Sequence, residues 1–525
     1  MTADWVVEHA DVWTMDPERP RAEAIAVAGG RVVYVGDQAG LAAWVGPDTE
    51  RTDAAGAVVL PGFVDAHLHP AEGGVELGQC GLGDATDLDG ALAAVRACDD
   101  GGRGWLVGGG WSLAAFPDAR PPDGALDAAF PDRPVFLWAE DGHSAWANAV
   151  ALRRAGVRAD TPDPPGGRFE RDPSGAPSGV LRESAAERVA ERVPRTTGAE
   201  WRAGVARAVA HANAHGITGL FEAAGRDRGA LRAYRALDRR GELHATVTVA
   251  IEVDGPGDVA RAVRWRRRFA SDHVAPIAAK IFVDGVIEAR TAAMLAPYLD
   301  TGTSGEPLWT DAALRQTVGA LAAAGFDVHL HAIGDRAVRQ ALDAVEAAPR
   351  GPRFGIAHLE CVDPADAPRF AALGVSAVFS PLWAYADDYV VDLTWPGLGP
   401  QRSAGLYPIG DLAAAGAPLA FGSDWTVSSL DPLQGIEVAV TRRDPDGDGV
   451  GDPLGDDLPL SVEAAVAAYT RGAAHAAHQP GGVIRVGAPA DLIALTADPR
   501  DLPSSRIGDI EVGWTRVRGV EVSPR

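Results

Sequence analysis

The sequence predicts an α/β protein in which parallel strands alternate with helices, together with a small β-structure built from both ends of the chain. Apolar runs of strand length alternate with Ala-rich helical stretches between residues 57 and 477, which is typical of parallel β/α folds. Segments rich in β-formers lie outside this region, at 3–50 and 491–520. A parallel α/β barrel holds about 250 residues or more in one unit, so a 525-residue chain does not require three separate domains.

The two ends of the chain have the composition of short strands. In the N-terminal part these segments lie at 5–10, 24–30 and 31–36. The pair Gly29-Gly30 separates the last two segments and is a hairpin signal. Segments of the same style follow near the C-terminus, at 491–495 and 514–520. We therefore expect both ends to contribute to one β-structure.

The middle of the chain supplies the strands and helices of the α/β region. Expected strands lie at 57–60, 135–138, 217–221, 277–283, 326–331, 354–356, 375–379 and 418–421. Expected helices lie at 199–215, 311–325, 334–348 and 461–477. A stretch rich in Gly, Pro and Asp at about 71–200 interrupts the alternation, and we expect it to be an insertion that shapes a pocket.

Charge and cysteine content restrict the partners and the compartment. Lys and Arg number 48 against 72 Asp and Glu, a net charge of −24, so the chain lacks the basic surface that binds nucleic acid or an anionic membrane. No apolar run reaches the roughly 18 residues of a membrane helix, and the first residues lack the basic and apolar parts of a signal peptide. Three cysteines, Cys80, Cys98 and Cys361, suit a reducing compartment. We expect a cytoplasmic protein that acts on a small molecule.

Lys280 is the single lysine among the 48 basic residues. All the others are arginine, a bias expected from a GC-rich genome. Where almost every cation is arginine, a lone lysine suggests a position that requires a primary amine, and chance is the alternative. Lys280 lies within the apolar run 277–283, a predicted strand.

Two histidines follow the first strand of the α/β region. The apolar run 57–60 leads into Pro-Gly-Phe-Val-Asp-Ala-His-Leu-His at 61–69. Because side chains alternate along a strand, His67 and His69 point to the same side. At the carboxyl end of a barrel strand such a pair is suited to bind a metal ion. A pair of hydrogen-bonded histidines is the alternative.

Polar groups also end or interrupt other apolar runs. His329 and His331 close the run at 326–331, His358 closes the next one, and Asp424 follows the run at 418–421. Polar groups on five separate strands are costly to bury unless they share a purpose. The sequence therefore predicts one polar site at the strand ends.

In their order along the chain, these motifs resemble those of the amidohydrolase superfamily. The resemblance lies in 61–69, in Gly-Ser-Asp-Trp at 422–425 and in Gly-Ala-Pro-Ala-Asp-Leu at 487–492. One branch of this superfamily, the YtcJ-like branch, includes N-substituted formamide deformylases. The chain resembles this branch at 280–285, 290–292 and 331–337. The resemblance covers nearly the whole chain. It implies a (β/α)8 TIM barrel at 61–479, with the insertion at about 71–200, and a small β-sandwich formed from 1–60 and 480–525.

The resemblance also implies a centre with two divalent metals. The ligands that it implies are His67, His69, Lys280, His331, His358 and Asp424. The first two histidines would hold one metal and the last two the other, and His329 is expected to support a ligand. Asp424 would bind a metal and take the proton from the attacking water. Two Zn2+ suit nitrogen and oxygen ligands, with manganese and iron as alternatives.

Lys280 has a specific role in this resemblance. It would bridge the metals as a carbamate made with carbon dioxide, which requires a neutral amine. Burial beside cations lowers the pKa of a lysine and supplies that neutral form. Arginine does not substitute, because its guanidinium stays protonated.

Several further residues are candidates for contacts with substrate. His143 lies in a motif at 141–146 that is similar to one of the family. It either contacts the substrate, including the oxyanion formed during the reaction, or has a structural role. Arg290 either clamps a carbonyl or carboxylate or braces Asp284. Three tryptophans either line an apolar pocket or pack in the core: Trp111, Trp383 and Trp425.

The predicted function is metal-dependent hydrolysis of an amide-type C–N bond. Metal-activated water attacks the carbonyl, and Asp424 passes the proton to the leaving amine. One alternative is a deaminase or cyclic-amide hydrolase of the same superfamily, and another is a metal-binding protein without catalysis. The resemblance also leads us to expect a homodimer.

Overall fold

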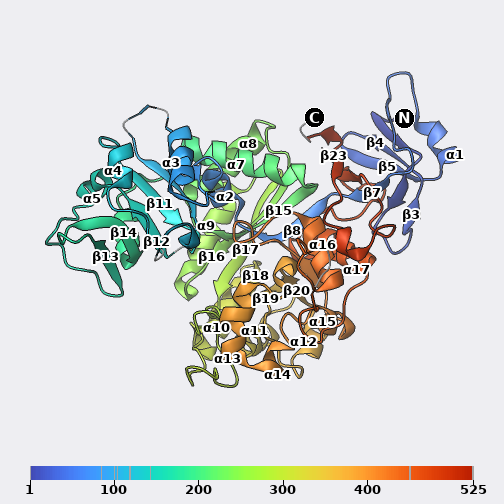
Figure 1. The fold of residues 1–525 in the computed structure, drawn as a ribbon. Coiled ribbons are helices and arrows are strands. Elements are labelled where there is room, and N and C mark those ends of the chain that lie inside the picture. The colour runs from blue at the N-terminus through green and yellow to red at the C-terminus, as the bar shows by residue number, and fades with distance from the viewer. Residues whose placement is uncertain are drawn as a thin grey trace. The chain divides into compact units, whose positions relative to one another are not determined.

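The computed structural model describes residues 2–83, 85–99, 101–102, 104–117, 120–141, 143–447 and 451–522. The chain divides into two compact units (Figure 1). The first unit comprises Met1–Pro70 and Ala208–Arg525, and the second comprises Ala71–Arg207. The second unit therefore covers the stretch that the sequence predicts as an insertion.

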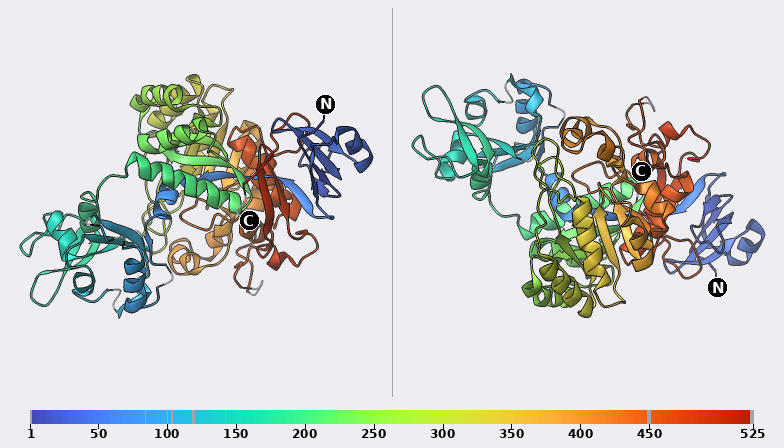
Figure 2. Two further views of the ribbon diagram at one scale, coloured as in Figure 1. Left: turned by 90° about the horizontal axis from the view of Figure 1, so that it is seen from above. Right: turned by 90° about the horizontal axis from the view of Figure 1, so that it is seen from below.

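The first unit contains a sheet of eight parallel strands in the order β21-β20-β19-β18-β17-β16-β15-β8. The strands are β8 (Phe63–Leu68), β15 (Ile217–Gly225), β16 (Thr246–Glu252), β17 (Val274–Phe282), β18 (Asp327–Ala332), β19 (Phe354–His358), β20 (Val375–Phe379) and β21 (Leu419–Phe421). The N–H of Asp424, just after β21, donates to the carbonyl oxygen of His67 in β8 at 2.7 Å. The sheet thus curls into a nearly closed barrel, which confirms the predicted (β/α)8 TIM barrel (Figures 1 and 2).

The barrel strands form where the sequence is apolar on both strand faces. Every residue of β8, β19 and β20 is buried, as expected for parallel strands that face the barrel interior on one side and helices on the other. Small side chains, such as Ala66, Ala250 and Ala357, pack together in one cluster. Against this background, the polar side chains near the carboxyl ends of the strands are exceptions.

Helices follow the barrel strands. The longer ones are α7 (Gly198–Ala214), α8 (Arg228–Arg239), α9 (Val259–Phe269), α10 (Asp311–Ala323), α11 (Asp335–Glu346) and α16 (Pro432–Thr441). The shorter ones include α12 (Ala367–Leu373), α15 (Ile409–Ala414), α17 (Val462–Ala467) and α18 (Ala473–Ala476). In α8 the buried side chains include Leu231, Tyr234 and Leu237. This spacing of three residues gives the helix one apolar face to bury.

Strands from both ends of the chain build the remaining β-structure of the first unit. One sheet has the order β24-β23-β22-β7-β2-β3 and another the order β5-β4-β1-β6. Their bounds are β1 (Trp5–Glu8), β2 (Asp11–Trp13), β3 (Arg21–Ala22), β4 (Ala24–Ala28), β5 (Arg31–Gly36), β6 (Glu50–Asp53), β7 (Val58–Pro61), β22 (Leu492–Leu495), β23 (Val512–Val517) and β24 (Val520–Glu521). Val12, Ile25 and Leu492 belong to one hydrophobic cluster, so the two sheets share a core. Gly29 and Gly30, with φ of 58° and 73°, connect β4 to β5 in the predicted hairpin.

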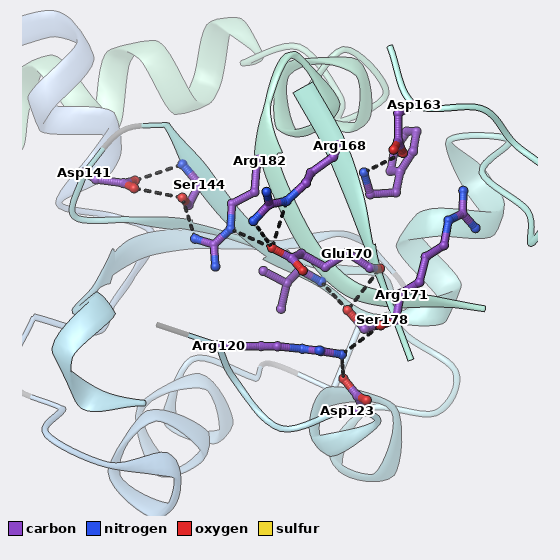
Figure 3. A network of polar contacts seen from close by, with 12 residues as sticks. Arg120, Asp123, Asp141, Ser144, Asp163, Arg168, Glu170, Arg171, Ser178 and Arg182 are labelled. Carbon is purple, nitrogen blue, oxygen red and sulfur yellow. Dashed lines mark hydrogen bonds and ion pairs between the residues drawn. The ribbon is translucent and has the colours of Figure 1, made fainter. Parts of the chain in front are cut away.

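The second unit has a sheet of its own, in the order β13-β14-β12-β11-β10-β9. Its strands are β9 (Cys80–Gly81), β10 (Leu106–Trp111), β11 (Val135–Ala139), β12 (Ser144–Ala147), β13 (Gly167–Arg171) and β14 (Pro177–Glu183), and its helices include α3 (Leu88–Ala97), α5 (Ala149–Arg154) and α6 (Ser184–Ala190). A polar network links its antiparallel strands (Figure 3). In it, Arg182 donates to Ser144 Oγ at 2.9 Å and to Glu170 Oε1 at 3.3 Å. These contacts tie β14 to β12 and β13.

The helices of the described residues include none that is both long and apolar enough to cross a membrane.

Candidate metal centre

The two histidines of β8 and Asp424 lie together at the carboxyl end of the barrel. His67 is in the strand and His69 follows it, while Asp424 follows β21. The Asp424 Oδ1 atom is 3.6 Å from His67 Nε2 and 3.1 Å from His69 Nε2. Backbone hydrogen bonds from Asp424 N–H to the His67 carbonyl and from His69 N–H to the Trp425 carbonyl fix this arrangement. The strand-end histidines thus share one carboxylate.

His329 orients His67. The two rings are joined by a hydrogen bond of 2.9 Å between His329 Nε2 and His67 Nδ1. This contact turns the other nitrogen, Nε2, toward Asp424 and toward Lys280, whose Nζ is 3.3 Å away. The contact fixes the orientation of the His67 ring, and the role of His329 in supporting a metal ligand stays a prediction.

His358 and His331 complete the group from neighbouring strands. His358 Nδ1 lies 3.8 Å from Asp424 Oδ2, and its ring centroid is 4.8 Å from that of His67 and 4.4 Å from that of His331. Trp383 stacks on His358 with the rings 5.6 Å apart and an interplanar angle of 8°. His331 Nε2 instead lies 3.3 Å from the carbonyl oxygen of Gly285. The six residues predicted as ligands therefore meet in one place.

The donor atoms of this group fit a divalent metal ion. His67, His358 and Asp424 each place one donor atom within 4.8 Å of the other two, and all three are buried. His358 Nδ1 is a buried polar atom with no hydrogen-bond partner, a costly condition unless a ligand satisfies it. Burial, together with the nearby charge of Lys280, lowers the pKa of His67 and His358 well below the usual range. Neutral imidazoles and a carboxylate are suitable ligands for such an ion.

Lys280 is buried in the centre of the group. Its side chain is 1% exposed, and its Nζ lies 4.8 Å from the centre of the Phe282 ring. Burial lowers the pKa of Lys280 to about 7, although Asp424 and Glu252 act in the opposite direction. The single lysine of the chain therefore has a readily accessible neutral form at neutral pH.

Asp65 supports the centre, although no sequence motif predicted a role for it. Asp65 is fully buried in β8, and its carboxylate accepts hydrogen bonds from His67 N–H at 3.0 Å and from the Ser423 hydroxyl at 2.6 Å. Ser423 N–H adds two contacts of 3.1 Å. Asp65 thus holds the end of β8 against the segment that carries Asp424. A carboxylate within an otherwise apolar strand was the sequence signal.

Arg290 does not brace Asp284, so that alternative is wrong. The Arg290 guanidinium pairs with Asp300 at 2.6 Å and donates to the carbonyl oxygens of Ile287 and Leu393. The carboxylate of Asp284 instead accepts backbone N–H groups, and the N–H donors are those of Ala293, Ile333 and Gly334. Arg290 therefore fastens loops together, and its guanidinium is engaged by these contacts.

Two predicted substrate contacts belong to the second unit. Trp111 is fully buried, donates its indole N–H to the Leu137 carbonyl at 3.1 Å and packs against Phe116, which is the core-packing alternative. His143 is exposed, and its Nδ1 lies 3.0 Å from Glu183 Oε2. Gly142, in the same motif, lies outside the described residues.

Trp425 lies beside the centre in the first unit. It directly follows Asp424, its ring centroid is 5.5 Å from that of His211, and it is 8% exposed. Its backbone contact with His69 ties it to the same strand end.

Residues 50–523 match the amidohydrolase family. The chain is 28% identical over 550 residues to an N-substituted formamide deformylase of Arthrobacter pascens, covering 98% of each chain. It is 30% identical over 522 residues to the protein LONG AFTER FAR-RED 3 of Arabidopsis thaliana, covering 95% of this chain and 88% of that one. The crystal structure of a metal-dependent hydrolase from Pyrococcus furiosus superposes with a TM-score of 0.77 at 25% identity, covering 94% of this chain and 99% of that one. The chain belongs to the amidohydrolase family.

Proposed function

We propose that the protein hydrolyses N-substituted formamides or related small amides at the centre formed by His67, His358, Asp424 and Lys280. The protein is a metal-dependent hydrolase of amide-type C–N bonds other than peptide bonds. The observation that carries the proposal is the convergence of these side chains, with His358 Nδ1 buried and without a hydrogen-bond partner. The similarity to the formamide deformylase supports the substrate class.

The centre suits a pair of zinc ions. We infer that His67 and His69 hold one ion, that His331 and His358 hold the other, and that Asp424 contributes an oxygen. Imidazole nitrogen and carboxylate oxygen are common zinc ligands in proteins. When bound, such ions lower the pKa of a water molecule and polarise a carbonyl group.

Lys280 is proposed to carry a carbamate. The ammonium first loses one proton; the neutral amine then attacks carbon dioxide, an N–C bond forms as one C=O π bond opens, and a second proton leaves the nitrogen, so that the neutral amine becomes an anionic carbamate. Burial supports this step, because it brings the pKa of Lys280 to about 7 and makes the amine available. The proximity of Nζ to His67 Nε2, 3.3 Å, supports a shared role with that ligand.

Asp424 is proposed as the group that moves the proton. Its carboxylate accepts a proton from the attacking water and delivers it to the nitrogen of the leaving amine. Its backbone N–H donates a hydrogen bond to the carbonyl oxygen of His67. Its side chain is 7% exposed and lies within 4 Å of His67, His69 and His358. Asp424 is thus positioned on a fixed element in a largely dry site.

The proposal includes further roles for residues around the centre. Trp425, next to Asp424, is proposed to line the apolar side of the substrate site, and exposed His143 of the second unit to contact substrate. Cys80, Cys98 and Cys361 are free thiols, which supports a cytoplasmic location. A homodimer is proposed on the basis of family resemblance.

The test combines metal content with turnover. Protein purified without chelator should contain about two equivalents of zinc by plasma mass spectrometry, as two-metal sites do, and should hydrolyse members of an N-substituted formamide panel. Asp424→Asn should lower kcat by at least about a hundredfold with metal retained. Asp509→Asn, at an exposed carboxylate outside the centre, is the matched control and should not change kcat.

Three other results would contradict the proposal. Full activity of Asp424→Asn would show that Asp424 does not transfer the proton. Turnover of ring amines or cyclic amides without any formamide turnover would indicate a deaminase or cyclic-amide hydrolase. Bound metal without turnover of any of these substrates would indicate a binding protein.

A further inference from the structure

The ring of His358 is oriented differently from those of two other proposed ligands. His67 is held by its hydrogen bond to His329, and His331 Nε2 lies 3.3 Å from the carbonyl oxygen of Gly285. His358 Nδ1 is buried and, among the described residues, has no hydrogen-bond partner. The ring of a metal-binding histidine is normally fixed by a hydrogen bond from a neighbouring group. A contact of another kind therefore sets the angle of the His358 ring.

The backbone at His358 is held, but it does not fix the ring. His358 has a φ of 80° and Leu359 a φ of 53°, so two consecutive residues with side chains adopt the left-handed region. Such conformations persist only where the surroundings enforce them. The N–H groups of Leu359 and Cys361 donate to the carbonyl oxygens of Ala332 and Ile333 at 3.1 and 3.0 Å. These bonds fasten the end of β19 to the end of β18 and leave the side chain free to turn.

Trp383 makes the most nearly parallel ring contact of His358. Their ring centroids lie 5.6 Å apart with an interplanar angle of 8°, whereas the rings of His67 and His331 meet that of His358 at 60°. This geometry is an offset stack, which is a favoured arrangement of two flat rings. Rotation of the imidazole about its Cβ–Cγ bond would bring one edge of the ring against the indole. The stack therefore restrains His358 as a hydrogen bond restrains His67.

Trp383 is itself held at both ends. It closes the short 3-10 helix Pro381–Trp383 just after β20, where its backbone N–H donates to the Ser380 carbonyl at 3.0 Å. Its indole N–H donates to Ser428 Oγ at 3.1 Å. The Ser428 hydroxyl in turn donates to the carbonyl oxygen of Ser423 at 2.8 Å. The indole is thus fixed to the segment that follows β21.

These contacts form a closed circuit through the centre. Ser423 directly precedes Asp424, and Asp424 Oδ2 lies 3.8 Å from His358 Nδ1. Starting from His358, the circuit runs through the Trp383 indole, Ser428 and Ser423 to Asp424, and so back to His358. The carboxylate and the imidazole come from different strands, and Trp383 joins the two. The circuit therefore sets the position of His358 relative to Asp424.

We propose that Trp383 is a positioning residue of the centre, and that its stack on His358 and its hydrogen bond to Ser428 hold the imidazole in the orientation that binds a metal ion. The inference rests on the proposed metal-dependent function. It gives Trp383 a role different from the lining of a pocket or the filling of a core. It also limits that role to the metal that His358 holds.

The test measures zinc affinity before any turnover. Zinc-loaded full-length proteins are titrated with a chelator, and the released zinc is followed with an indicator dye. Trp383→Leu keeps an apolar side chain without a ring, and we expect it to hold one equivalent of zinc about 10–100-fold more weakly, the range for loss of a group that orients a ligand. The zinc assigned to His67 and His69 should be released as in wild type. Trp265→Leu, at a half-buried tryptophan of α9 that contacts Phe269, is the matched control and should release zinc as wild type does.

Two milder variants separate the stack from packing in general. Trp383→Phe keeps a ring on His358 and should retain more zinc affinity than Trp383→Leu. Ser428→Ala removes the acceptor of the indole N–H and should weaken binding of the same equivalent about two- to tenfold, the range for one hydrogen bond. Ser428→Ala also serves if Trp383→Leu does not fold.

Nuclear magnetic resonance of protein that contains tryptophan labelled with nitrogen-15 gives a second readout. The indole N–H signal of Trp383 is the one that is missing from Trp383→Phe. We expect this signal to shift when zinc is added to metal-free wild type, because the indole lies against the ring that binds the ion.

The outcomes separate the inference from the proposed reaction. Zinc affinity that is unchanged in Trp383→Leu and Ser428→Ala, an equal loss of affinity in Trp265→Leu, or a Trp383 signal that does not shift would overturn the inference. If zinc binding depends on Trp383 but no formamide is hydrolysed, the positioning role stands and the proposed reaction fails. Wild type that binds no divalent metal would contradict both.

Discussion

His329 Nε2 lies 2.9 Å from His67 Nδ1, and this hydrogen bond leaves His67 Nε2 facing Lys280 and Asp424. Removing a residue that orients a metal ligand lowers metal affinity by about 10–100-fold. We therefore expect His329→Ala to retain its fold but to lose zinc to a competing chelator at a lower chelator concentration. His9→Ala, at an exposed histidine of the β-structure, is the control. Equal zinc affinity of His329→Ala and wild type would show that the hydrogen bond does not position His67.

Asp65 and Ser423 are predicted to be coupled in stability. Asp65→Ala leaves the N–H groups of His67 and Ser423 buried without their acceptor, at a cost of about 1–3 kcal/mol for such a group. Ser423→Ala removes the hydroxyl contact alone and should cost less. Urea denaturation of both single variants and the double variant gives the coupling energy, which we expect to be about 0.5–3 kcal/mol. Additive effects of the two substitutions would contradict the proposed link between β8 and the segment that carries Asp424.

Lys280 is predicted to be irreplaceable by arginine. The guanidinium is larger, stays protonated and forms no carbamate, so it places a fixed charge among the histidines of the centre. We expect Lys280→Arg to bind about half of the wild-type zinc or less, measured by plasma mass spectrometry on proteins prepared side by side. Arg443→Lys is the reciprocal exchange outside the centre and should leave zinc content unchanged. Full zinc content in Lys280→Arg would exclude a bridging carbamate.

The polar residues at the strand ends were predictable because their positions follow from the local alternation of side chains along each strand. The alternation of side chains placed His67 and His69 on one side, and the apolar runs placed Lys280, His331 and His358 on parallel strands whose carboxyl ends meet. The hairpin at Gly29-Gly30 was predictable for the same local reason.

Contacts between loops were not predictable from the same signals. Asp284 was a candidate partner for Arg290, because the two residues are six positions apart in the sequence. In the structure Arg290 forms its ion pair with Asp300 instead. Trp111 was equally compatible with a pocket and with a core until the position of its indole was known. Such pairs depend on tertiary structure that no short pattern encodes.

The three thiols are predicted to differ sharply in reactivity. Cys98 is exposed, whereas Cys80 and Cys361 are buried. Burial raises the pKa of Cys80, and a hydrogen bond with Cys98 raises it further; burial likewise raises the pKa of Cys361. A thiol whose pKa is raised stays protonated at pH 8, and the thiolate is the reactive form. We expect Ellman's reagent to label about one thiol rapidly in the native protein and all three cysteines in urea. Cys98→Ser should remove the fast phase, and a fast phase that persists in this variant would show that a buried thiol is accessible.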